Sequence, residues 1–256
     1  PLVAPAFGAL LLMLSGWPAI FLALAVYALL MMVWIAWMMP VRPPVALDRR
    51  LRDVVRGWGR VLGHRPAMVI ILANGLAFAC LFAFVTDSAF VYLRFYGLDE
   101  HQFPLLFGAN VATMILFNRL NVLLLRRYPA RQLMGLALAI QLVAAGALLV
   151  AVLVSGRPSL WLTVPLLMIA GGTVAMVIPN AIACFTHYFP HDSGAATGIN
   201  GSLQFLIAGV VGMLLTTLHD HSLLPLALAM MVSTVLASLV FRLGTRQEVM
   251  VSGEVP

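Results

Sequence analysis

The chain has 256 residues, of which 62% are hydrophobic and only 9% are charged. A soluble domain carries about 25% charged residues, and a chain of this length has too little interior to bury so many apolar side chains, so the composition excludes a soluble enzyme. The net charge of +6 comes from fifteen arginines and no lysine. These arginines lie beside long apolar runs, which indicates the inner membrane surface as their partner and not nucleic acid.

Eight apolar runs have the character of membrane-crossing helices, each of which needs about 20 residues. In chain order they are 1–16, 18–39, 67–92, 104–125, 132–154, 160–185, 194–218 and 223–243. The first run is short and opens directly at Pro1, so we expect the natural N-terminus to lie upstream of it. The sequence therefore predicts an all-α integral membrane protein with eight transmembrane helices.

The arginines between these runs predict the orientation of the helices. Successive connections lie on opposite sides of the membrane and so form two groups. One group holds only Arg94 and Arg157. The other group holds twelve arginines: Arg42, Arg49, Arg50, Arg52, Arg56, Arg60, Arg65, Arg126, Arg127, Arg131, Arg242 and Arg246. Arginine-rich connections stay on the cytoplasmic side. We therefore expect a multi-pass protein of the inner (plasma) membrane whose C-terminus is cytoplasmic.

The connection 41–66 is long and basic, and it contains apolar residues at helical spacing. These are Leu47, Leu51, Val54, Val55, Trp58, Val61 and Leu62, with arginines mostly between them. This pattern suits an amphipathic helix on the inner membrane face, or equally a solvated linker helix. With two runs before it and six after it, the connection suggests a transporter of two six-helix halves. The expected parts are 1–40, the last two helices of the N-terminal half; 41–66, the linker; 67–243, the six-helix C-terminal half; and 244–256, a cytoplasmic tail.

Several short segments along the chain, rich in polar or small residues, occur in an order and spacing typical of a known family. Ala4-Pro5-Ala6-Phe7-Gly8-Ala9 resembles the end of the antiporter motif in the fifth helix of major facilitator drug exporters. Similar segments continue to about Leu243: Gly16-Trp17 with Ile20-Phe21, Gln102-Phe103 with Leu105-Leu106-Phe107-Gly108-Ala109-Asn110, Arg119-Leu120-Asn121 with Arg126-Arg127-Tyr128, Pro179-Asn180-Ala181, Phe189-Pro190-His191, Gly194-Ala195-Ala196 with Gln204-Phe205, and Leu218-His219-Asp220 with Leu224-Pro225. Within that superfamily the chain most resembles the bicyclomycin-resistance (Bcr/CflA) group of drug/proton antiporters.

The resemblance implies that the eight runs correspond to helices five to twelve of a twelve-helix bundle. It implies proton-coupled export of small amphipathic drugs or metabolites by a monomer, with the proton gradient as energy source and no cofactor. The main proton-titrating carboxylate of the resembled exporters lies upstream of helix five, so we expect the chain alone not to transport. The chain departs from the family pattern at Ala9, at Val41-Arg42, and at Asp87-Ser88-Ala89, where a Gly-Ser-Pro type break is usual.

Two positions near the start and four near Arg119 are candidates for conformational control. Pro5 with Gly8 is either an ordinary Pro/Gly pair of a membrane helix or, as the resemblance implies, a seal between the two halves. Arg119, Asn121, Arg126 and Arg127 resemble the loop motif that holds neighbouring helix ends in one state. The alternative is that these arginines snorkel to the interface; we favour gating for Arg119 and Asn121, and snorkelling for Arg126 and Arg127.

Asp87 is the one acid that falls within an apolar run. An intramembrane acid is costly and points to function, here the binding of a proton or of a cationic drug. Asp is also a good N-cap, so Asp87 could instead cap a helix that restarts at Ser88, or it could simply be solvated at the membrane interface.

Amides and aromatic residues in the apolar runs are the candidates for a substrate cavity. The residues are Asn74, Phe78, Phe82, Asn110, Asn180, Asn200 and Gln204. Phe78 and Phe82 follow Asn74 at i+4 and i+8, which gives a helix face suited to a flat, amphipathic or cationic molecule. Each amide could instead bond two helices together.

Other chemistries find little support in the sequence. The histidines of the loops show no convergent third ligand, so we predict no metal site, and Cys80 and Cys184 are interpreted as structural thiols. An intramembrane enzyme acting on lipid-like substrates would show clustered acids or histidines, whereas the acids here are few and scattered. A membrane scaffold without transport activity is the other alternative.

Overall fold

The computed structural model describes residues 11, 15–38, 51–99, 102–218 and 220–252, with side chains left out at 51–55 and 245–252. The chain divides into two compact units, Pro1–Leu51 and Arg52–Pro256. In the first unit, α2 (Trp17–Met38) is apolar on every side, with a mean hydropathy of 2.6 and no buried residue. A helix that is apolar all round suits a lipid environment.

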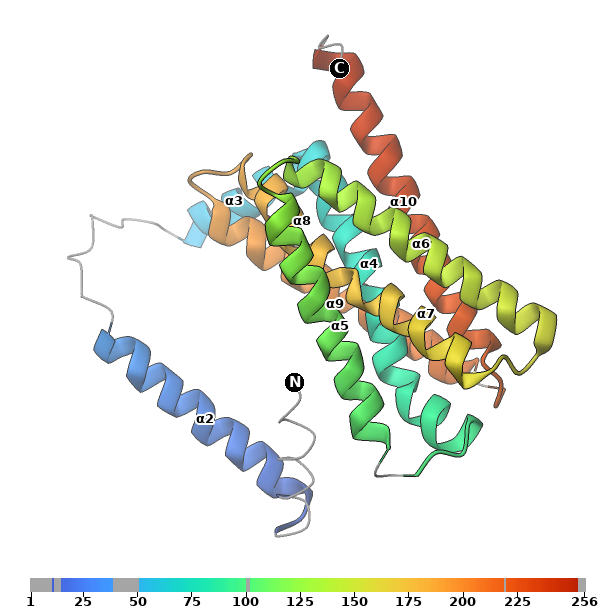
Figure 1. The fold of residues 1–256 in the computed structure, drawn as a ribbon. Helices are drawn as coiled ribbons and strands as arrows, with labels where there is room; N and C mark the ends of the chain where they lie inside the picture. The colour runs from blue at the N-terminus through green and yellow to red at the C-terminus, as the bar shows by residue number, and fades with distance from the viewer. Residues whose placement is uncertain (1–10, 12–14, 39–50, 100–101, 219, 253–256) are drawn as a thin grey trace. The chain divides into compact units, whose positions relative to one another are not determined.

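The second unit is a bundle of membrane-length helices, shown from cyan to red in Figure 1. In chain order its elements are α3 (Leu51–Gly63), α4 (Arg65–Ala89), η1 (Phe90–Phe95), α5 (Phe103–Leu124), α6 (Ala130–Ser155), α7 (Leu160–Gly172), α8 (Val174–Thr186), α9 (Ser193–Thr217) and α10 (Leu224–Ser252). Helix α4 packs against α8, α9 and α10, and its alanine-rich face is fully buried. Small residues allow this close packing in a membrane, where burial of apolar surface supplies little driving force between helices.

Seven helices among the described residues are long and apolar enough to cross a membrane. They match seven of the eight runs expected from the sequence to within a few residues, and the remaining run, 1–16, lies almost wholly outside the described residues. The span that corresponds to the run 67–92 ends at Phe95 and not at Tyr92, because the π-helix η1 continues directly from α4. The run 160–185 forms one span, Leu160–Thr186, interrupted only at Thr173 between α7 and α8.

Two glycines allow backbones to approach closely at helix crossings. A Cβ on Gly244 of α10 would overlap the side chain of Val69 of α4, and a Cβ on Gly172 of α7 would lie 2.9 Å from Thr113 Cγ2 of α5. A side chain at either position would therefore require the facing side chain or its helix to shift.

The linker helix α3 is helical as expected, but its apolar residues divide between two environments. Val61 is fully buried, whereas Trp58 and Leu62 are exposed. Arg60 of α3 forms an ion pair with Asp192, and the ring of His64, the N-cap of α4 directly after α3, lies 4.8 Å from that of Tyr188 and 5.3 Å from that of Phe189. Helix α3 thus packs on the connection between α8 and α9, an arrangement that neither sequence interpretation included. Leu47 lies outside the described residues.

Candidate functional site

The most extended polar contact between helices joins α4 to α9. Asn74 is fully buried, and its Nδ2 donates to Asn200 Oδ1 at 2.9 Å and to Gln204 Oε1 at 3.0 Å. Both N–H groups of Asn74 are used in this arrangement, so the amide N–H groups of Asn200 and Gln204 can serve other acceptors. Three of the amides that the sequence proposed therefore form one cluster, which we call the amide cluster.

Asn74 Oδ1 is buried without a hydrogen-bond partner in the described part of the chain. Buried polar atoms in proteins are nearly always hydrogen-bonded, and each exception needs an explanation. A membrane-buried acceptor beside two amides is a suitable partner for a hydroxyl or N–H group of a bound molecule.

Aromatic side chains continue this face of α4 beyond the amide cluster. The ring of Phe78 lies 5.4 Å from that of Phe205 in an edge-to-face arrangement and 6.2 Å from that of Phe82. A Cβ on Gly212 of α9 would lie 3.4 Å from both Phe82 and the Thr86 hydroxyl. Asn74, Phe78, Phe82 and Thr86 are spaced four residues apart, so one stripe of α4 faces α9 from an amide end to a hydroxyl end.

Asp87 lies at the far end of this stripe and is 8% exposed. The helix continues through Ser88, whose hydroxyl donates to Val85 O at 2.9 Å, and the N–H of Phe90 bonds to Asp87 O. Capping of a helix that restarts at Ser88 is therefore wrong, because no helix begins there. The α-helix changes to π geometry after Ala89. Short π segments in helices occur frequently at functional sites.

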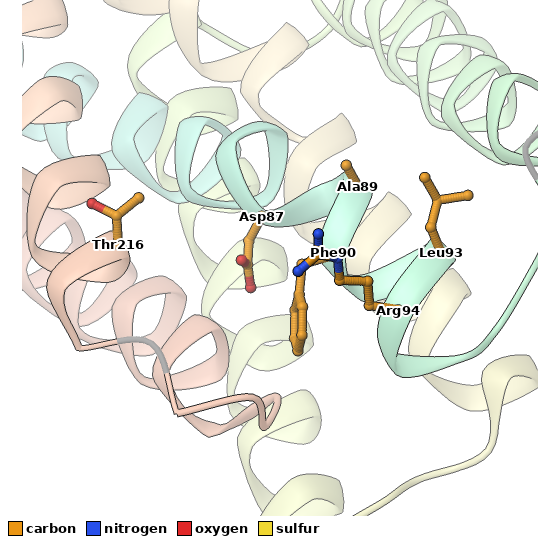
Figure 2. A pocket seen from close by; sticks show the side chains of 6 residues that line it. All are labelled: Asp87, Ala89, Phe90, Leu93, Arg94 and Thr216. Carbon is orange, nitrogen blue, oxygen red and sulfur yellow. The ribbon is translucent and has the colours of Figure 1, made fainter.

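A cavity of about 510 Å³ opens beside Asp87. Figure 2 shows its lining: Asp87 and Ala89 from α4, Phe90, Leu93 and Arg94 from η1, and Thr216 from α9. From the sequence, Arg94 was expected only as a charge in a connection between spans, and Thr216 was not a candidate. The sequence does contain a signal for Arg94: it follows Asp87 by seven residues, and residues at that spacing lie on nearly the same face of a helix. No sequence signal pointed to Thr216.

Two other candidate amides lie away from the amide cluster. Asn180 of α8 donates from Nδ2 to Asn121 Oδ1 of α5 at 2.7 Å and to Met176 O at 2.8 Å. Asn110 of α5 is 3% exposed, and its Nδ2 has no hydrogen-bond partner in the described residues. A Cβ on Gly171 would come within 3.2 Å of that nitrogen. Asn180 therefore bonds two helices together, and Asn110 packs at the contact between α5 and α7.

The candidates for conformational control are also spread out. Arg119, Arg126 and Arg127 are exposed, and only Asn121 is buried, at 1%. Arg126 and Arg127 lie beyond the end of α5 in a turn, where the N–H of Arg127 bonds to Leu124 O at 2.9 Å. Pro5 and Gly8 lie outside the described residues. The contact between Asn121 and Asn180 was not expected and joins a gating candidate to a cavity candidate.

Gln141 of α6 is a further buried amide, which the sequence analysis did not assign to a site. Its Nε2 donates to Ala77 O of α4 at 3.2 Å and to Ala170 O of α7 at 3.1 Å. These bonds to backbone carbonyls of two neighbouring helices indicate a structural role. In the part of the chain that is described, no group of three or more His, Cys, Asp and Glu side chains is arranged to hold a metal ion.

Comparison with known proteins confirms the family resemblance. The family model of the Major Facilitator Superfamily matches residues 1–213. The chain is 26% identical over 243 residues to a protein of Haemophilus influenzae named "Bicyclomycin resistance protein homolog", covering 94% of this chain and 61% of that protein. It is also 26% identical over 260 residues to "Uncharacterized MFS-type transporter YdgK" of Bacillus subtilis, covering 97% of this chain and 62% of that protein. The chain thus spans about three fifths of the length of these curated relatives.

Proposed function

The chain belongs to the Major Facilitator Superfamily, and from this membership we propose that it serves in a secondary transporter that exports small amphipathic drugs or metabolites in exchange for protons. The name of the Haemophilus influenzae relative supports drug export as the activity and bicyclomycin as a first substrate to test. The membership favours a transporter over both the intramembrane enzyme and the scaffold.

The observation that carries the proposal is the stripe of α4 that faces α9. Its amide cluster supplies hydrogen-bonding groups inside a membrane-length helix pair, and Phe78, Phe82 and Phe205 supply aromatic faces beside them. A site for amphipathic molecules needs both kinds of surface, mostly apolar with a few well-placed polar groups. Asn110 and Asn180 are left to helix packing in this proposal, because their contacts are with α5, α7 and α8.

Asp87 is proposed as the group that binds a proton or the cationic end of a substrate. The span Arg65–Phe95 continues eight residues beyond Asp87, which at about 1.5 Å per residue places it about 12 Å from the end of the helix. A carboxylate at that depth is costly to keep charged, so protonation and cation binding compete for it. That competition is the thermodynamic requirement for exchange of a proton against a cation.

We further propose that the seven spans, with an eighth at 1–16, correspond to helices five to twelve of a two-half bundle, with α3 as the cytoplasmic linker and the C-terminus in the cytoplasm. The protein would work as a monomer in the inner membrane, driven by the proton gradient without a cofactor. Asn121, through its bond to Asn180, and Arg119 would control the change of state, as would Pro5 and Gly8; Arg126 and Arg127 would snorkel to the interface.

The test is efflux of ethidium and resistance to bicyclomycin in cells that express the protein at its natural length. We expect efflux that stops when a protonophore collapses the proton gradient, and at least a tenfold loss in Asp87→Asn. Asp99→Asn, in a connection outside the spans, is the matched control and should leave efflux unchanged. Efflux that persists in Asp87→Asn with its pH dependence intact would remove Asp87 from coupling.

A further inference from the structure

The linker helix α3 joins the bundle at the level of the membrane surface. It ends at Gly63, and the span Arg65–Phe95 begins after a single residue, His64. Figure 1 shows α3 at the end of the bundle where α4 begins. The 31 residues of that span are about 45 Å long at about 1.5 Å per residue, which is the thickness of a bilayer with its headgroups. The last turn of α3 therefore lies at the depth of the lipid headgroups.

One side of α3 is held against the protein. Val61 is fully buried, and a Cβ on Gly57 would lie 3.3 Å from Asp192 Oδ1 and 3.8 Å from Ala195 Cβ, at the start of α9. Arg60 forms its ion pair with Asp192 at 2.8 Å on the same side. These contacts fix the rotation of α3 about its axis and determine which side chains remain outside the contact.

Two large apolar side chains remain outside it. Trp58 is 46% exposed and Leu62 is 53% exposed, and because they are four residues apart they lie on one face of the helix. Tryptophan is enriched at membrane surfaces, where its ring contacts apolar chains and its N–H contacts water or headgroups. A short helix with Trp and Leu on one face and arginines beside them is typical of a segment that lies in the plane of the interface.

The charges beside this face are positive. Arg56 and Arg60 of α3 are exposed, as is Arg65 at the start of α4. Arg60 gives two of the five N–H donors of a guanidinium to Asp192 Oδ2, at 3.0 Å from Nε and 2.8 Å from Nη2, so three donors remain for a second oxyanion. The planar guanidinium matches the oxygens of a phosphate as well as those of a carboxylate.

We propose that the exposed face of α3 binds anionic phospholipids of the membrane that the protein crosses, with Trp58 and Leu62 at the acyl chains and Arg60 and Arg65 on the lipid phosphates. An anionic lipid is favoured over a zwitterionic one, because the ammonium of a zwitterionic headgroup would add a positive charge beside the arginines. This assignment selects the membrane-surface interpretation of the linker over the solvated one and adds the class of lipid. It does not depend on the proposed transport function.

The test follows the fluorescence of Trp58. Every other tryptophan of the natural-length protein is replaced by phenylalanine, and the protein is reconstituted in vesicles of equal parts phosphatidylcholine and phosphatidylglycerol. Bromine on acyl chains quenches tryptophan on contact and is placed on one lipid or on the other. We expect quenching of Trp58 to be about twofold stronger with brominated phosphatidylglycerol, and the preference to fall at high salt. Val143→Trp, on a residue that is 71% exposed in the middle of α6, is the matched control and should show no preference.

Variants then test the arginines. Arg65→Gln should lower the preference of Trp58 for brominated phosphatidylglycerol, whereas Arg94→Gln, at the other end of the same span, should leave it unchanged. Arg60→Gln should also lower it. Asp192→Asn removes a negative charge and weakens the hold on Arg60, so it should raise the preference. An ion pair that only fixed α3 in place would lower the preference in both of these variants, because both would detach the helix.

Equal quenching of Trp58 by the two brominated lipids would overturn the proposal. If acrylamide in the water quenches Trp58 and neither brominated lipid does, α3 is a solvated linker. If Trp58 is protected from acrylamide and from both lipids, another part of the protein covers it, and the lipid assignment again fails. Arg65→Lys keeps the charge and should keep the preference, so a loss in Arg65→Lys equal to that in Arg65→Gln would contradict the role of charge. Thermal melting of each variant shows whether a changed preference is a loss of fold.

Discussion

Arg60 of α3 holds Asp192, at the start of α9, through two hydrogen bonds to the same oxygen, from Nε at 3.0 Å and from Nη2 at 2.8 Å. Asp192 occupies the N-cap position of α9, where an aspartate commonly accepts from the first backbone N–H groups, yet its side chain makes no such bond. The carboxylate is directed to the linker helix instead. The linker is therefore attached to the connection between α8 and α9 at the same end of the bundle where α4 begins.

We expect a modest stability effect from this ion pair, because its side chains are 58% and 22% exposed. Exposed pairs contribute about 0.2–1 kcal/mol, so Arg60→Gln should lower the melting temperature in detergent by only a few degrees, and less at high salt. The reversed pair Arg60→Glu with Asp192→Arg should recover part of the loss. If the loss of melting temperature in the double variant equals the sum of the losses in the two single variants, the two residues do not interact.

The amide cluster should matter more for stability. Asn74→Leu removes both donors to Asn200 and Gln204 and leaves two acceptors without their partner inside a helix pair. Interhelical polar bonds in membranes contribute about 0.6–1.7 kcal/mol each, so we expect a loss of about 1–3 kcal/mol in unfolding from lipid micelles. Asn118→Leu, an exposed amide on α5, is the control and should change little. A stable Asn74→Leu protein would show that the cluster serves binding alone.

The close approach of α10 to α4 depends on Gly244. Gly244→Ala would place a methyl group on the Val69 side chain, and overpacking of this kind costs about 1–3 kcal/mol. Val69→Ala in the same chain should recover part of the lost melting temperature, because it removes the two nearest atoms, Val69 Cγ1 and Cγ2, and leaves only the Val69 Cβ, 2.9 Å from the added methyl group. Gly194→Ala is the matched control, since nothing lies within 4 Å of a Cβ there. If Val69→Ala does not raise the melting temperature of Gly244→Ala, the contact between these two residues is not the cause of the loss.

Tyr96 should make the protein sensitive to alkaline pH. Its hydroxyl lies 2.9 Å from Pro158 O and 2.7 Å from Thr163 Oγ1, beyond the end of the span. Burial raises the pKa of Tyr96 above its ordinary value of 10.0, although the bond with Thr163 and the charge of Arg157 act in the opposite direction. The folded protein thus holds this proton more tightly than the unfolded chain.

The contribution of this pKa shift to the free energy of unfolding is therefore fully present below about pH 10, the ordinary pKa of tyrosine. It is lost as the pH rises through the pKa of Tyr96 in the folded protein. Unfolding followed by circular dichroism between neutral and strongly alkaline pH would measure this loss. Tyr96→Phe should be less stable at neutral pH, because the hydrogen bonds are gone, and should lose less on going to high pH. If the free energy of unfolding of Tyr96→Phe falls with alkaline pH as steeply as that of the unchanged protein, other groups cause the loss.

Much of the fold could be predicted from the sequence, because a membrane-crossing helix is a local property of about 20 successive apolar residues. Seven runs read from hydropathy match the observed spans closely. The amphipathic linker was predicted for the same reason, since its periodicity lies within one segment. Asp87 and Asn74 also stood out without a structure, because polar residues in apolar runs are rare.

The partners of those residues required the tertiary structure. Nothing local to Asn74 distinguishes Asn200 and Gln204, more than 120 residues away, from Asn180, which instead bonds to Asn121. The same holds for Arg60 with Asp192, and for Thr216, which joins Asp87 only because α9 packs along α4. Hydropathy along a chain determines which segments enter the membrane, whereas the rotation and crossing of each helix, set by close packing, decide which polar side chains meet.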